Sequence, residues 1–212
     1  IIAGKSSSFG DFGHDGFLTK VEDDGQTLWL EAFGGANPEA IHDLAETPDG
    51  GFILVGSTES YGSLLKDVFV VKVDQNGVLE WTNTYGGNDL DEGKSVYIGE
   101  DGVLYLIGYT RSFGFGEADI WLIVIDSQGN ELNSYTFGTE LNNYGVGIIS
   151  DGSGHLIILS NDEINGYSEQ KVAVRKIGLD GSQIWYNYHQ SDQFEISSGI
   201  IADGEGYYYV AG

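Results

Sequence analysis

The sequence predicts an all-β protein made of repeated antiparallel units, and three observations support this prediction. Glycines recur every 52 residues, short apolar segments alternate with glycine-containing turns, and no segment shows helical periodicity. Residues of one type recur at this spacing or a multiple of it in three sets: Gly10, Gly62, Gly114 and Gly166; Gly25, Gly77, Gly129 and Gly181; and Trp29, Trp81 and Trp185. The repeats keep this register without net insertion, which chance similarity does not explain.

One complete unit runs from Gly86 to Phe137. In "GKSVYIGEDG" and "VLYLIGYT" we expect a first strand, a turn and a second strand. A loop, "RSFGFGEA", precedes the third strand, "DIWLIVID". The turn "SQG" then leads to a fourth strand, "NELNSYTF". The unit is therefore predicted to be a four-stranded antiparallel sheet.

The third strand indicates how the units pack. Its core, residues 120–125, is apolar without alternation, so both of its faces are expected to be covered. Four-stranded sheets that are covered on both faces and repeat along the chain predict a β-propeller, in which sheets stack as blades around an axis. We expect Trp81 to fill the space between neighbouring blades.

The repeat divides the chain into one propeller with three whole blades and two incomplete ones. The blades are predicted at residues 34–85, 86–137 and 138–189, with partial blades at 1–33 and 190–212. Residues 1–4 and 209–212 occupy the same position of the repeat. We therefore expect a segment of a larger propeller, completed by further blades of the same chain or by another copy of the chain.

Charge and composition exclude several classes of partner. The chain has 9 basic and 33 acidic residues and a net charge of −24, which disfavours binding to nucleic acids or anionic membranes. No apolar stretch is long enough to span a membrane. There is no cysteine, so disulfide bonds are excluded. The recurring Lys20, Lys72 and Lys176 are expected to pair with acidic residues.

The unit resembles the bacterial extracellular β-propeller repeats known as SBBP-type repeats. The resemblance rests on Gly86-Gly87-Asn88-Asp89, on Gly108-Tyr109-Thr110-Arg111-Ser112, and on the segment DVFVVKVD at residues 67–74. The fourth repeat departs from the pattern, with Ser160 in place of glycine and Lys171 in place of aspartate. The resemblance implies a secreted or surface-displayed propeller and implies no particular chemistry.

An aspartate begins the third strand of three units. Asp15, Asp67 and Asp119 offer one carboxylate per blade at the mouth of a loop, where a cation such as Ca²⁺ prefers oxygen ligands. Alternatively, each side chain accepts hydrogen bonds from backbone N–H groups of the preceding loop. Calcium is the only cofactor that this pattern suggests.

The long connections define one edge of the predicted blades as a candidate binding face. "STESYGSLLK" and "GGNDLDE" emerge on the same edge, and long loops carry function more often than tight turns. Aromatic and acidic side chains on this face would suit a glycan, a cation or another surface protein; the candidates are Phe9, Tyr61, Phe113, Asp89 and Asp91. Alternatively, the aromatic rings hold the loops against the blades.

These observations predict a non-enzymatic, secreted or cell-surface module that binds a ligand or a protein through its long-loop face. The alternative is an enzyme on the same fold, either a glycan-cleaving enzyme or a quinone-dependent dehydrogenase. A catalytic centre should interrupt the repeat with a unique polar cluster on the inner strands. The visible interruptions mostly replace glycines and aromatic residues, which favours binding.

Overall fold

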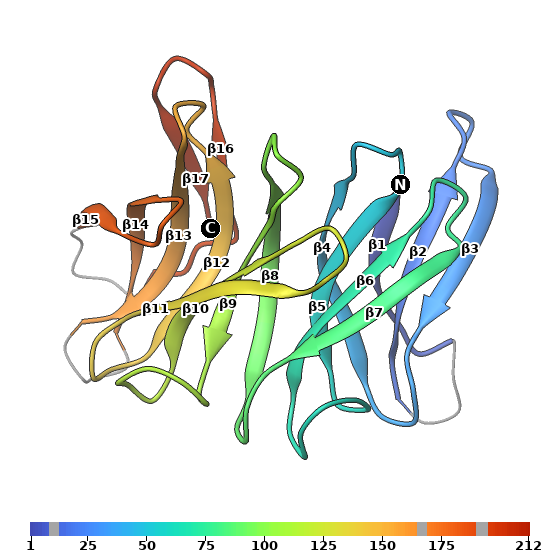
Figure 1. Ribbon diagram of the computed structural model, residues 1–212, viewed down its shortest axis with the longest axis horizontal. Coiled ribbons are helices and arrows are strands. Elements are labelled where there is room, and N and C mark those ends of the chain that lie inside the picture. Colours follow the sequence, from blue (N-terminus) through green and yellow to red (C-terminus); the bar gives the residue numbers. More distant parts are fainter. Residues whose placement is uncertain (9–12, 165–168, 190–194) are drawn as a thin grey trace.

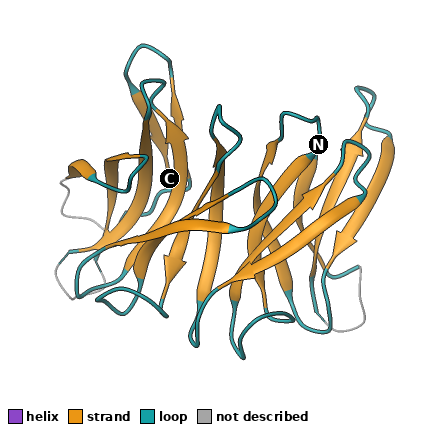
Figure 2. Cartoon of the chain, in the orientation of Figure 1, coloured by secondary structure: helices purple, strands orange, loops and turns teal. Residues whose placement is uncertain are grey.

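The computed structural model describes residues 1–8, 13–164, 169–189 and 195–212, and these residues form strands, turns and loops (Figure 2). The described residues contain no helix, and hence none long and apolar enough to cross a membrane. The strands are β1 (Ile2–Ser6), β2 (Asp15–Val21), β3 (Thr27–Phe33), β4 (Glu39–Glu46), β5 (Phe52–Thr58), β6 (Asp67–Val73), β7 (Leu79–Tyr85), β8 (Asp91–Ile98), β9 (Leu104–Thr110), β10 (Asp119–Ile125), β11 (Glu131–Phe137), β12 (Asn143–Ser150), β13 (His155–Glu163), β14 (Gln170–Gly178), β15 (Gln183–Tyr188), β16 (Gly199–Ala202) and β17 (Tyr208–Ala211).

The strands form five antiparallel sheets that follow one another along the chain (Figure 1). Three sheets have four strands each, namely β4–β7, β8–β11 and β12–β15. The first sheet has three strands, β1–β3, and the last has two, β16 and β17. Within each sheet, every strand pairs only with its neighbours in the sequence. The all-β class and the four-stranded antiparallel sheets are thus confirmed.

Apolar layers fill the spaces between consecutive sheets. One such layer joins Val68 and Val70 of β6 to Trp121, Ile123 and Ile125 of β10. Every residue of β6 and of β10 is buried, as expected for a strand covered on both faces. Hydrophobic burial between sheets is therefore the main force that holds the repeats together.

The first strands of consecutive sheets also contact one another. β4 packs against β8, β8 against β12 and β12 against β16. The sheets form an open row, with β1–β3 at one end and β16–β17 at the other (Figure 1). Because this row is not a closed ring, the propeller stays a prediction.

A recurring aromatic contact joins each sheet to the turn of the next. Gly77 and Gly129, in the turns after β6 and β10, have φ angles of 82° and 81°, which only glycine adopts without strain. The indole of Trp29 lies against Gly77, and that of Trp81 lies against Gly129, so closely that a Cβ at either glycine would come within 2.8 to 3.1 Å of the ring. Trp81 thus lies between neighbouring sheets, as its recurrence predicts.

Tight turns and long connections lie on opposite edges of the sheets. Thr58 pairs with Asp67 across the end of β5 and β6, and Val68 pairs with Tyr85 at the end of β7. The connections of residues 59–66 and 86–90 therefore leave from the same edge. We call this edge, with the described loops 59–66, 86–90 and 111–118, the long-loop edge.

Candidate functional site

The two described loops between second and third strands begin with the same turn. The Thr58 hydroxyl oxygen accepts hydrogen bonds from the backbone N–H groups of Ser60 and Tyr61, at 3.0 and 3.3 Å. Thr110 accepts the equivalent bonds from Ser112 and Phe113, at 3.0 and 3.2 Å. The loops are therefore set in a defined direction before any ligand binds.

The aromatic residues predicted to bind a ligand help to hold these loops. The Tyr61 ring stacks on Phe69 with 5.9 Å between centroids, and its hydroxyl donates to the Gly34 carbonyl at 2.7 Å. The Phe113 ring lies 5.1 Å from Trp121. Nevertheless, Tyr61 is 44% exposed and Phe113 is 45% exposed, so each ring keeps a free edge at the surface. Phe9 lies outside the described residues.

The recurring aspartates bind the loop backbone. Asp67 accepts hydrogen bonds from the Ser63 backbone N–H and from its hydroxyl. Asp119 accepts from the backbone N–H groups of Phe115 and Gly116, at 2.8 and 2.9 Å. Asp15 is half-buried, and burial, followed by the charge of Glu39, raises its pKa. In the described part of the chain, no cluster of three or more His, Cys, Asp or Glu side chains could hold a metal ion. Asp67 and Asp119 thus already use their oxygens to anchor loops.

Asp91 joins three segments beneath the long-loop edge. Its Oδ2 accepts hydrogen bonds from the Gly87 N–H at 2.8 Å and from the Ser112 hydroxyl at 2.7 Å. Asp91 and Asp67 converge beside Gly86, where a Cβ would not fit. Burial, together with the nearby charge of Asp91, raises the pKa of Asp67, although the bonds from Ser63 oppose this. Asp89 is exposed, and its carboxylate accepts from the Leu90 N–H.

Glu39 is the equivalent of Asp91 in the preceding unit. The comparison shows that one oxygen of Asp91 lacks a hydrogen-bond partner, whereas both oxygens of Glu39 have one. Glu39 Oε1 accepts from the Thr58 hydroxyl at 2.7 Å, and Oε2 accepts from the Gly35 N–H at 2.8 Å. Asp91 is shorter by one methylene group, and its fully buried Oδ1 has no hydrogen-bond partner. This acceptor differs from most buried oxygens in proteins, which are paired.

The tips of the two loops expose apolar side chains to solvent. Leu64 is fully exposed, Phe115 is 93% exposed, and Leu65 is about half exposed. The loops that carry them belong to neighbouring sheets. Exposed acidic side chains also lie in or next to the connections between strands, namely Glu59, Asp89, Glu117 and Glu140. The long-loop edge therefore presents both apolar and acidic side chains to solvent.

A polar cluster near the first strands was missed by the reasoning from sequence. Glu92 on β8 is buried and forms ion pairs with Lys66, at 2.9 Å, and with Lys94. The Tyr109 hydroxyl donates to Glu92 at 3.1 Å, and the Lys94 ammonium lies 5.8 Å from the Tyr109 ring. Burial alone would raise the pKa of Glu92, but Lys94 and Lys66 outweigh it and hold the pKa at about 2. Burial and the charge of Glu92 raise the pKa of Tyr109.

The first strands line a hollow of about 420 Å³ next to this cluster. His42 and Lys94 are bulged residues at the same position of β4 and β8, and both line the hollow. His42 Nδ1 bonds to the Gly93 carbonyl at 2.8 Å, and desolvation, followed by the Lys94 charge, lowers the pKa of His42. Asp43 accepts from the Ser95 hydroxyl at 2.7 Å. His42 and Asp43, which line the hollow, are therefore already hydrogen-bonded within the protein.

The sequence contains a signal for the Glu92 cluster. At the repeat position of Glu92, the preceding unit has Ala40 and the following unit has Tyr144. Lys66 is one of only nine basic residues in the chain. A second interruption lies in the fourth repeat, where Arg175 contacts Asp162 at 2.5 Å and stacks over Tyr186 at 4.3 Å. Arg175 and Asp162 are buried, so this network supports packing and leaves no open site.

Comparison with known proteins gives distant matches. No protein-family model matches the chain. The regulatory protein FlaEY of Caulobacter vibrioides is 27% identical over 64% of this chain, which spans only 17% of the length of FlaEY. A crystal structure described as a eukaryotic initiation factor matches 82% of this chain and 52% of its own, with 8% identity and a TM-score of 0.41. These similarities assign neither a family nor a function.

Proposed function

We propose that the chain is part of a β-propeller that acts as a non-enzymatic, secreted or cell-surface module and binds a protein through its long-loop edge. The propeller is supported by the repeated four-stranded sheets and by the contacts between their first strands. The location outside the cell is supported by the resemblance of the repeat to the SBBP-type pattern.

The observation that carries the proposal is the exposure of Leu64 and Phe115 at the tips of two neighbouring, anchored loops. Exposed apolar patches on a protein surface mark sites of interaction with other molecules. Thr58 and Thr110 fix the loops from which these side chains project. Binding therefore requires little ordering of the loops, which lowers its entropic cost.

The acidic character of the chain indicates the chemistry of the partner. Glu59, Asp89, Glu117 and Glu140 are exposed in or next to the connections, and the whole chain carries a charge of −24. A partner that offers apolar pockets bordered by Lys and Arg complements both features. Long-range attraction to such a surface speeds association and weakens as salt is added.

The partner is sought with the immobilised chain, and its binding is then measured with variants. Proteins retained by the chain are identified by mass spectrometry, and the Kd of each purified binder is measured for the parent chain and for Leu64→Ser/Phe115→Ser. The control is Val78→Ser, because Val78 is also an exposed apolar residue, at 61%, but lies in a tight turn on the opposite edge. We expect the double variant to lose at least about tenfold in affinity, as for truncated anchor residues, and the control to keep its affinity.

Two results would contradict the proposal. In the first, the double variant binds as tightly as the parent chain, so that the loop tips are not the contact. In the second, a glycan array retains the parent chain and the double variant equally, while no protein binder responds to the substitutions. That result would identify a glycan-binding module that uses another surface.

A further inference from the structure

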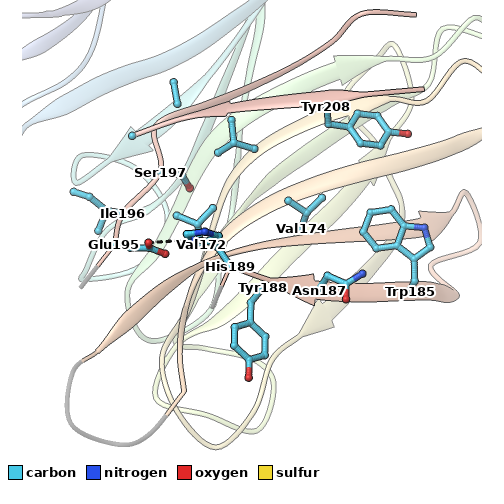
Figure 3. A pocket seen from close by; sticks show the side chains of 13 residues that line it. Val172, Val174, Trp185, Asn187, Tyr188, His189, Glu195, Ile196, Ser197 and Tyr208 are labelled. Atoms are coloured by element: carbon cyan, nitrogen blue, oxygen red, sulfur yellow. Dashed lines mark hydrogen bonds and ion pairs between the residues drawn. The ribbon is translucent and has the colours of Figure 1, made fainter. Parts of the chain in front are cut away.

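A hollow of about 490 Å³ lies between the fourth strands β7 and β11 of the second and third sheets, and we call it the β7–β11 hollow. Aromatic and hydroxyl side chains line it together, among them Tyr85, Phe113, Trp121, Ser134 and Thr136. The larger groove beside β14 and β15, of about 930 Å³, is lined mainly by apolar side chains (Figure 3). Polar groups restrict the chemistry of a ligand more than apolar walls do, so the β7–β11 hollow says more about what it binds.

The register of the strands directs two hydroxyl groups into the β7–β11 hollow. Between β10 and β11, Trp121 pairs with Thr136 and Ile123 pairs with Ser134. Residues that pair across antiparallel strands lie on the same face of the sheet. Trp121 and Ile123 belong to the apolar layer against the β4–β7 sheet, so Ser134 and Thr136 also face that sheet. Neither hydroxyl group is hydrogen-bonded to a described residue, and both can therefore bond to a ligand.

A difference at one repeat position leaves a carbonyl group of the hollow open. Phe113 occupies the position of Tyr61, whose hydroxyl donates to the Gly34 carbonyl at 2.7 Å. Gly86 is the equivalent of Gly34, and it lines the hollow. Phe113 has no hydroxyl group, and no described residue donates a hydrogen bond to the Gly86 carbonyl. The β7–β11 hollow therefore keeps an unused acceptor where the preceding unit binds a hydroxyl group.

The ring of Phe113 is placed in the same way as the ring of Tyr61. A Cβ at Gly35 would lie 3.1 Å from the Tyr61 hydroxyl oxygen, and a Cβ at the equivalent Gly87 would lie 3.2 Å from Cζ of Phe113. The outer end of each ring thus points at the same glycine pair of its unit. A hydroxyl group next to this end of Phe113 reaches the Gly86 carbonyl, as that of Tyr61 reaches its own partner.

The polar groups of the hollow favour a ligand that carries several hydroxyl groups. The Gly86 carbonyl and the exposed Glu131 carboxylate only accept hydrogen bonds, whereas Ser134 and Thr136 both donate and accept. The Phe113 ring, 45% exposed, offers an apolar surface beside these groups. A sugar ring matches both features, because it presents C–H groups on one face and hydroxyl groups at its edge. The volume also lies within the range of about 300 to 1,000 Å³ that is usual for small-ligand pockets.

We propose that the β7–β11 hollow binds one neutral sugar residue. One hydroxyl group of the sugar donates to the Gly86 carbonyl, as the Tyr61 hydroxyl does to the equivalent carbonyl in the preceding unit. Further hydroxyl groups of the sugar bond to Ser134 and Thr136. The apolar face of the sugar ring packs on Phe113, in the part of this ring that the protein leaves exposed.

The test begins with a panel of D-glucose, D-galactose, D-mannose, L-fucose and N-acetyl-D-glucosamine, each added to the parent chain in saturation-transfer NMR. The Kd of each sugar that binds is then measured for the parent chain and for Phe113→Tyr. We expect Phe113→Tyr to weaken binding at least about tenfold, because its hydroxyl group takes both the Gly86 carbonyl and the place of the sugar hydroxyl. The urea midpoint of this variant should equal or exceed that of the parent chain, because the variant gains the hydrogen bond that Tyr61 makes. The loss of binding is then separate from any loss of the fold.

A second variant and two controls locate the sugar within the molecule. Thr136→Val removes one hydroxyl group at nearly constant shape, and we expect it to weaken binding several-fold. Thr82→Val is the first control, because Thr82 occupies the repeat position of Ser134 and does not line the hollow. Leu64→Ser/Phe115→Ser is the second, because neither residue lines the hollow, and both controls should keep the affinity for the sugar. The sugar site and the proposed protein-binding site are therefore tested by different variants.

Three outcomes would overturn the proposal. If no sugar of the panel binds the parent chain, the hollow is not a sugar site. If Phe113→Tyr binds the sugar as tightly as the parent chain does, the Gly86 carbonyl is not part of the contact. If Leu64→Ser/Phe115→Ser loses the sugar and Phe113→Tyr keeps it, the sugar binds at the loop tips.

Discussion

Glu92 allows a quantitative test of how the buried ion-pair cluster stabilises the fold. Its pKa falls from an ordinary 4.5 to about 2, because Lys94 and Lys66 outweigh the effect of burial. At 1.36 kcal/mol per pKa unit, this shift corresponds to about 3 kcal/mol of folding free energy at neutral pH. A carboxyl group whose pKa is depressed by folding contributes this stability above its unfolded pKa. The contribution is then lost as the pH falls from 4.5 towards 2.

The assay is urea denaturation of the parent chain and of Glu92→Gln at several pH values between 7 and 2.5. At pH 7 we expect the variant to be less stable by up to about 3 kcal/mol, because Lys66 and Lys94, whose side chains are 30% exposed, lose their shared carboxylate. The difference between the two chains should shrink steadily below pH 4.5. The exposed Glu46, substituted by Gln, serves as the control for the loss of one acidic charge. A difference that stays constant from pH 7 to pH 2.5 would refute the assigned role of Glu92.

Three further substitutions test the packing and the loop anchors by the same denaturation assay. Trp81→Ala should lower stability by about 3 kcal/mol, because Trp81 packs against the apolar layer and Gly129, and an unchanged midpoint would show that this contact is unimportant. Asp91→Glu should raise stability and Glu39→Asp should lower it, each by about 1 kcal/mol, because the longer side chain reaches the threonine hydroxyl and the shorter one leaves an oxygen unpaired. Shifts of the same sign in both variants would contradict this comparison.

The strands and their grouping into sheets follow from local patterns in the sequence. The continuous apolar segment of residues 120–125 predicts a strand covered on both faces, and all of β10 is indeed buried. The recurrence of Trp81 also predicts its position between sheets, because a residue that serves each unit serves the contact between units. These features depend on residues close in sequence or related by the constant spacing, so no knowledge of the three-dimensional arrangement is needed.

The clusters of polar side chains depend on neighbours that the sequence does not reveal. Glu92 meets Lys66 across 26 residues, and Arg175 meets Asp162 on the adjacent strand, so each charge gains its partner only through strand register. From the sequence alone, Glu92 and Arg175 are seen only as residues that differ from those at the same position of the other repeats. The difference between Asp91 and Glu39 was likewise invisible, since both are acidic residues at the start of a first strand. Only the hydrogen-bond partners distinguish them.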